Sequence, residues 1–229
     1  MNFQAQNIQC LPPVFHAAKS ICLLAPHQDD EALGAGGLLA CLAATTDVQI
    51  TVIFMTDGSR GIKHSLPPIT KHIRHSEALK AQKLLGDSVR YEFLDFPDGQ
   101  LANKTNILEK LNRTDRQFDI LLLPNNADWH PDHVATHNLG REFAQIQNIN
   151  NILVYEVWSP LQNPDVLCNI TDYVQHKRDL IQCYKSQIAQ VDFEVAIVGL
   201  NAYRAMSLPK QNKYPNKTNY AEAFLTVGH

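Results

Sequence analysis

The sequence has no large excess of charge of either sign. This balance is informative about a nucleic-acid partner. It contains 20 basic and 23 acidic residues, so the formal net charge is −3 at pH 7. Domains that bind nucleic acid usually carry a clear basic excess on one face. We therefore expect no nucleic-acid partner.

Closely spaced cysteines and long apolar segments are also lacking. The five cysteines are far apart and form no CxxC pair, which argues against a thiolate zinc site or a redox motif. The longest near-apolar run, residues 33–44, is shorter than the ~20 residues that span a bilayer. Residues 1–20 lack the pattern of a secretory signal. We expect reduced thiols, no membrane span and a cytoplasmic location.

The length and the order of apolar segments predict the fold. At ~150 residues per domain, the 229 residues favour one domain spanning 1–229. Strands are predicted at residues 21–25, 49–55, 91–94, 120–123 and 152–157, and helices at 32–44, 70–85, 105–111, 134–147 and 173–187. Apolar strands that alternate with helices are typical of a parallel sheet covered on both faces. The expected fold class is α/β, a three-layer Rossmann-like fold with a mainly parallel sheet.

A first cluster of polar residues follows the first predicted strand. His27, Asp29, Asp30 and Glu31 lie within five consecutive positions. In open α/β sheets ligands bind at the carboxyl ends of strands. Neighbouring carboxylates repel each other, and a divalent cation removes that conflict. The alternative is an acidic helix N-terminus, which the helix dipole favours.

A second cluster follows the predicted strand at 120–123. It contains Asp128, His130, Asp132 and His133. Zinc favours imidazole and carboxylate ligands, and a catalytic zinc takes three of them. His27, one carboxylate of the first cluster, and either His130 or His133 would supply that set. The carboxylate and imidazole left over would then be available for acid–base chemistry in a hydrolysis.

Both clusters match the motifs of a known family. Residues 26–31, P-H-Q-D-D-E, resemble the H-P-D-D-E motif of the PIG-L/LmbE-like zinc-dependent deacetylases, and residues 130–133, H-P-D-H, resemble the second motif of that family. Weaker matches are Arg74-x-x-Glu77, the P-D-G loop at 97–99, and a late helix with Lys177, Tyr184 and Ser186-Gln187. Gln28 stands where the family usually has proline, and we expect this to change loop rigidity without loss of metal.

The resemblance implies an LmbE-like fold and assigns roles to the clusters. His27, Asp30 and His133 would bind one Zn²⁺. Asp29 would be the general base for the attacking water. His130, in its protonated form, would stabilise the developing oxyanion. Either Asp29 or His130 would protonate the departing amine.

The resemblance also implies roles around these residues. Asp132 would orient His130, with a helix N-cap as the alternative. Arg74 and Asp98 would contact sugar hydroxyls. For Arg74 the alternative is an ion pair with Glu77 inside one helix.

The implied activity is deacetylation of an N-acetylated amino sugar of the N-acetylglucosamine type, or of a conjugate of one. The competing hypotheses are hydrolysis of another small amide, hydrolysis of a phosphoester with Mg²⁺ or Mn²⁺, and a non-catalytic saccharide-binding module. The many imidazoles disfavour Mg²⁺, and the presence of Asp29 disfavours a module without chemistry. Trp129 and Trp158 fit either a sugar-binding wall or the core. A homo-oligomer is compatible with the resemblance.

Overall fold

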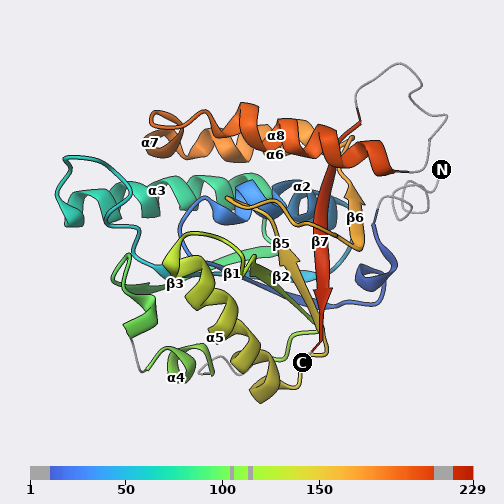
Figure 1. Ribbon diagram of the computed structural model, residues 1–229, viewed down its shortest axis with the longest axis horizontal. Helices are drawn as coiled ribbons and strands as arrows, with labels where there is room; N and C mark the ends of the chain where they lie inside the picture. Colours follow the sequence, from blue (N-terminus) through green and yellow to red (C-terminus); the bar gives the residue numbers. More distant parts are fainter. Residues whose placement is uncertain (1–10, 104–105, 113–115, 209–218, 229) are drawn as a thin grey trace.

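The most apolar segments of the sequence form adjacent strands at the centre of one sheet. In the computed structural model, which describes residues 11–103, 106–112, 116–208 and 219–228, these strands are β1 (Ser20–Ala25), β2 (Gln49–Thr56), β4 (Ile120–Pro124) and β5 (Asn151–Tyr155). Nearly all of their residues are buried, because helices cover both faces of the sheet (Figure 1). The predicted α/β class and its central strands are confirmed.

The strand order explains where a site can form. The seven-stranded sheet has the order β3-β2-β1-β4-β5-β7-β6, with β3 (Val89–Phe96) through β5 parallel. β7 (Ala221–Val227) is antiparallel to both β5 and β6 (Val166–Asn169), a feature that the sequence did not predict. The order reverses between β1 and β4, so a crevice opens beyond the carboxyl ends of these two strands.

Helices form a layer on each side of the sheet. α2 (Asp30–Thr45), α3 (Pro67–Leu85), α6 (Val174–Cys183), α7 (Lys185–Ile188) and α8 (Phe193–Arg204) lie on one side, and α4 (Ile107–Asn112) and α5 (Pro131–Gln147) lie on the other (Figure 1). Alternate strand residues supply the two cores: Ile21 and Leu23 pack into the first, whereas Cys22 and Leu24 pack into the second. Every position of β1 after Ser20 is therefore apolar. Within the described residues, no helix has both the length and the apolar character needed to cross a membrane.

The predicted helix at 173–187 is interrupted at Tyr184. This residue has φ −89° and ψ 58°, outside the helical region, and it separates α6 from α7. Its ring is fully buried and its hydroxyl donates to the Glu31 carboxylate. A tertiary hydrogen bond thus overrides the local helical pattern. α8 was not predicted, and the predicted start of α4 at residue 105 lies outside the described residues.

A buried ion pair ties α2 to β7, the strand beside the edge strand β6. Lys177 donates to the Glu222 carboxylate of β7 (2.6 Å) and to the carbonyl oxygen of Leu33 (2.7 Å). Glu222 also accepts the backbone N–H groups of Gly37 (2.8 Å) and Leu38 (2.7 Å) in α2. Because both charged groups are hydrogen-bonded, their burial is satisfied. The helix that begins with the acidic cluster is therefore held at its middle by α6 and β7.

Glycine allows α2 to approach β5 closely, which leads to a prediction. A Cβ at Gly34 would collide with the buried ring of Tyr155 and lie 3.1 Å from the carbonyl oxygen of Glu156. We expect Gly34→Ala to lower the free energy of unfolding by about 1–3 kcal/mol, the usual cost of overpacking. The matched control is Gly199→Ala in α8, where a Cβ meets nothing within 4 Å. It should raise stability by about 0.5–1 kcal/mol. Denaturant unfolding measures both, and equal effects would contradict the packing argument.

Candidate active site and metal centre

The two polar clusters meet in the crevice between β1 and β4. The first lies in the loop between β1 and α2, and the second lies between β4 and α5. His27 Nε2 and Asp132 Oδ2, which are 105 positions apart in sequence, are 3.3 Å apart. The neighbouring strands thus bring the two predicted loops together.

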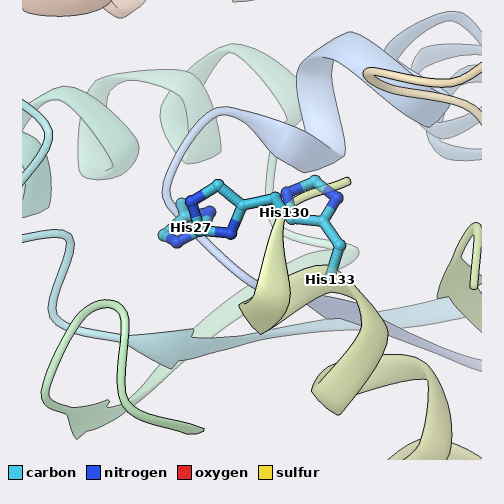
Figure 2. Close-up of side chains that lie close together, drawn as sticks. All are labelled: His27, His130 and His133. Carbon is cyan, nitrogen blue, oxygen red and sulfur yellow. The ribbon is translucent and has the colours of Figure 1, made fainter. Parts of the chain in front are cut away.

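Three imidazoles form the centre of this meeting point (Figure 2). The ring centroid of His27 lies 4.7 Å from that of His130 and 5.6 Å from that of His133, and those of His130 and His133 are 5.3 Å apart. One ring nitrogen from each lies within 4.8 Å of the others. His27 forms a second such group with Asp98 and Asp132. The described residues therefore contain His/Asp groups that could hold a metal ion.

Asp30 lies between two of the predicted ligands. Its Oδ2 atom is 3.3 Å from His27 Nδ1 and 3.4 Å from His133 Nε2, and it also accepts the backbone N–H of His27 (2.8 Å). The structure thus brings together the three residues, His27, Asp30 and His133, that the resemblance assigns to the metal.

The surroundings of His133 show whether His27, Asp30 and His133 are suited to bind a cation. The residue is fully buried, and within the described residues neither ring nitrogen forms a well-aligned hydrogen bond. Burial opposes its protonation, but the charge of Asp30 and the contact with Asp128 raise the pKa of His133 to about 9. A buried imidazole without an aligned partner, facing a buried carboxylate, fits a metal ligand.

Asp29 faces a different direction from Asp30. It has a φ of 147°, a region that residues other than glycine rarely adopt. Its Oδ1 atom accepts from Arg74 (2.8 Å), and its backbone N–H donates to Glu31 Oε2 (3.2 Å). The backbone conformation therefore separates two adjacent carboxylates onto different partners.

The two carboxylates also differ in their acid–base behaviour. Burial raises the pKa of Asp29, and the negative charge of Asp30 adds to this while Arg74 opposes it. For Asp30 burial acts in the same sense, but His133 and His27 outweigh it and lower the pKa. Asp30 is therefore the ionised partner of the imidazoles, whereas Asp29 is the better proton acceptor near neutral pH.

His130 differs from the expectation that it is protonated. Burial lowers its pKa, and the positive charges of His27 and His133 lower it further. His130 caps α5, because its Nδ1 atom accepts the backbone N–H of Asp132 (3.3 Å). An accepting Nδ1 places the proton on Nε2. The neutral ring is thus the form that the structure favours, and it still has one N–H to donate.

Asp132 also differs from both of its expected roles, since it neither orients His130 through its carboxylate nor caps the helix. The carboxylate accepts the backbone N–H groups of Gly99 (2.6 Å) and Leu101 (3.1 Å) and contacts His27. It fixes the P-D-G loop against the cluster. That loop places Asp98 Oδ1 3.3 Å from His27 Nε2.

Arg74 does not pair with Glu77 in α3. Its guanidinium donates to Asp29 and to the carbonyl oxygen of Gln28. Glu77 instead accepts from the backbone N–H (2.8 Å) and hydroxyl (2.7 Å) of Ser186. The helix therefore supplies a cation to the site rather than an internal ion pair.

Asp128 received no role from the sequence, although it belongs to the second cluster. Its buried carboxylate lies 3.1 Å from His133 Nδ1 and accepts the backbone N–H groups of Trp129 (2.9 Å) and Trp158 (3.3 Å). Such carboxylates orient imidazole ligands. Its place in the cluster was the signal, but the contacts with Trp158 depend on the tertiary fold.

A cavity of about 490 Å³ opens over the cluster. Its inner end is lined by His27, Asp29, Asp30, Arg74, Asp98 and His130. Trp129 and Trp158 also line it, so neither belongs to the core. The volume lies in the range of ~300–1,000 Å³ typical of small-molecule sites.

A comparison with known protein families matches the part of the chain that contains both polar clusters. A family model described as PIG-L, GlcNAc-PI de-N-acetylase, matches residues 22–144, more than half of the chain. The chain belongs to the PIG-L family. The match includes both clusters, so the resemblance of the motifs is confirmed.

Similar proteins extend the comparison of this PIG-L chain. A diacetylchitobiose deacetylase from Thermococcus kodakarensis is 24% identical over 203 residues, which cover 79% of this chain and 74% of that protein. A 1D-myo-inositol 2-acetamido-2-deoxy-alpha-D-glucopyranoside deacetylase from Corynebacterium diphtheriae is 31% identical over 162 residues, which cover 56% of this chain and 53% of that protein. The solved structure of N,N'-diacetylchitobiose deacetylase from Pyrococcus horikoshii has a TM-score of 0.78 at 22% identity, covering 95% of this chain and 87% of that one. This likeness confirms the fold.

Two buried histidines on successive turns of α5 allow a matched test of the metal centre. His133 faces Asp30, whereas His137 donates from Nδ1 to the carbonyl oxygen of Pro124 (2.9 Å). We predict that His133→Ala reduces the metal content of the PIG-L protein to background, while His137→Ala retains it. Elemental analysis after dialysis measures this. A stoichiometric metal content in His133→Ala would remove that residue from the ligand set.

Proposed function

We propose that this protein is a zinc-dependent hydrolase that removes the acetyl group from an N-acetylated amino sugar of the N-acetylglucosamine type, or from a conjugate of one. The observation that carries the proposal is the divergence of two adjacent carboxylates. Asp30 faces His27 and His133, whereas Asp29 lines the cavity beside Arg74. One loop thus offers a ligand for a metal and a base for water.

The substrate class is supported by the family and by the similar proteins. The family description and the names of both similar deacetylases refer to acetylated amino sugars. We propose further that residues 1–229 form a single domain, since the described strands all join one sheet.

His27, Asp30 and His133 are the residues that we assign to one Zn²⁺. A mixture of imidazole and carboxylate ligands is typical of zinc, whereas Mg²⁺ prefers oxygen ligands alone. Bound there, zinc would polarise the acetamide carbonyl as a Lewis acid and favour ionisation of water.

Asp29 is assigned as the general base. Its raised pKa suits it to take a proton from the attacking water near neutral pH, as the water oxygen adds to the carbonyl carbon. Arg74 holds the carboxylate in place through Oδ1. The C–N bond then breaks, and the amine leaves with the proton that Asp29 took from the water.

His130 is assigned to the developing charge on the carbonyl oxygen. Its Nε2–H is the donor, because Nδ1 is occupied by the Asp132 N–H. Asp132 acts as a positioning residue for the P-D-G loop. Arg74 and Asp98 line the cavity at its inner end, where we propose that they also contact sugar hydroxyls.

Substitutions of the adjacent residues Asp29 and Asp30 distinguish the proposed general base from the proposed metal ligand. We predict that Asp29→Asn retains full metal content but lowers kcat about 10²–10⁴-fold, because it removes proton transfer while preserving an oxygen for Arg74. Asp30→Asn should instead lose metal. Metal content and acetate release measured on the same preparations distinguish the two. Wild-type turnover in Asp29→Asn would refute its assignment as base.

The function as a whole is tested by elemental analysis together with amine release from N-acetylglucosamine and its simple glycosides. Near-stoichiometric zinc with amine release is the expected result. Zinc without release would redirect the search to other amides. No zinc after reconstitution would overturn the hydrolase proposal in favour of a binding module.

A further inference from the structure

Both tryptophans of the chain lie side by side at the mouth of the cavity. Trp129 is 68% exposed and Trp158 is 37% exposed, and their ring centroids are 5.4 Å apart. Large aromatic side chains exposed beside a cavity are typical of binding sites. The proposed deacetylation chemistry uses neither of them.

The two rings belong to a continuous aromatic wall, which we define as Trp129, Trp158 and Phe193. Trp129 lies 5.7 Å from His130 between ring centroids, and Trp158 lies 5.4 Å from Phe193. Phe193 is buried and supports Trp158 from α8. The wall therefore extends from His130 in the histidine cluster to Phe193 in α8.

Asp128 fixes the wall relative to the cluster. The same carboxylate that contacts His133 accepts the backbone N–H groups of both tryptophans. Their positions are thus set by a buried group that also orients a proposed metal ligand. A ligand that stacks on the wall would meet a surface that is already in place, which reduces the entropy lost on binding.

The remainder of the cavity lining is polar. Arg60 lines it, and its backbone N–H donates to Asp98 (3.0 Å). The side-chain amides of Gln187 and Gln190 both donate to the carbonyl oxygen of Gly61 (3.2 and 2.7 Å), so the amide oxygens are the groups they can offer to a ligand. Arg60, which is hydrogen-bonded to Asp98, and the two glutamines therefore line the same cavity as the aromatic wall.

Flat aromatic faces combined with hydrogen-bonding groups fit a pyranose ring. Such a ring presents C–H groups on its faces and hydroxyl groups around its edge. An alkyl chain would leave Arg60 and the glutamine oxygens desolvated without partners, which is costly. The inner end of the cavity already holds the residues assigned to the acetamide and its sugar.

We propose that the aromatic wall is an outer subsite that binds a second sugar ring, joined by a glycosidic bond to the ring that carries the acetamide. This rests on the proposed function and narrows it: the preferred substrate is a disaccharide or longer glycan rather than free N-acetylglucosamine.

The sequence provides a direct reporter for this subsite. Because the only two tryptophans are in the wall, tryptophan emission reports on the wall alone. The full chain is titrated, with and without zinc, with N-acetylglucosamine, N,N'-diacetylchitobiose and the disaccharide of glucosamine. We expect both disaccharides to change the emission at concentrations about tenfold lower than the monosaccharide does. The signal requires no turnover, so it is independent of the deacetylase proposal.

Steady-state kinetics supply the second measurement. Trp129→Ala and Trp158→Ala should raise KM for diacetylchitobiose about tenfold more than KM for a methyl glycoside of N-acetylglucosamine, and Trp129→Phe should restore part of the loss. The matched control is Tyr203→Ala in α8, an aromatic residue that is 63% exposed but does not line the cavity. It should leave both KM values unchanged.

Three results would overturn the subsite. The first is deacetylation of sugars with no emission response to disaccharides. The second is an equal loss for mono- and disaccharide substrates in the tryptophan variants. The third is emission that depends on protein concentration and not on sugar, which would show that a second copy of the chain covers the wall. An emission response to disaccharides without acetate release would support the subsite and refute the proposed hydrolase instead.

Discussion

The adjacency of β1 and β4 is the constraint on which the site depends. Had another strand been placed between them, the loops that follow these two strands would lie apart, and Asp30 could not contact both His27 and His133. The contacts of 3.3 and 3.4 Å are thus a consequence of the strand order. The reversal of that order also leaves no crossover helix above the crevice at this point, which is why small molecules bind there in open α/β sheets. The pairing of β1 with β4 therefore places the two polar loops beside each other.

The separation of the Asp29 and Asp30 side chains onto different partners depends on a strained backbone. A φ of 147° costs on the order of 1–3 kcal/mol for a residue with a side chain. The surrounding contacts offset that cost: Arg74 holds the side chain of Asp29, and Glu31 accepts its backbone N–H. Glu31 is held in turn by the hydroxyls of Tyr91 (3.0 Å) and Tyr184. The interruption of the helix at Tyr184 is therefore part of the same arrangement that orients Asp29, the proposed base.

Much of the fold and the identity of the site could be predicted from the sequence, because local patterns carry that information. Apolar runs located the central strands to within a few residues, and the two polar clusters directly after β1 and β4 located the site. What the sequence could not show are contacts between distant segments. The carboxylate of Asp132 binds the 99–101 loop, and Asp128 joins His133 to a tryptophan 30 positions away. Burial lowers the pKa of His130, and the charges of His27 and His133 lower it further. The antiparallel strands β6 and β7 were missed because β6 has only four residues and the apolar run of β7 is interrupted by Glu222 and Thr226. Their pairing is not encoded locally.

The ion pair between Lys177 and Glu222 has a consequence for the order of events during synthesis. Gly37 and Glu222, which are hydrogen-bonded in the folded protein, are 185 positions apart. A ribosome adds about 5–20 residues per second, so α2 emerges roughly 10–40 seconds before the residue that anchors its middle. Until then the helix that begins at Asp30 lacks its support from β7 and α6. The support of α2, the helix that contains Asp30, is therefore complete only after the strand that contains Glu222 has joined the sheet.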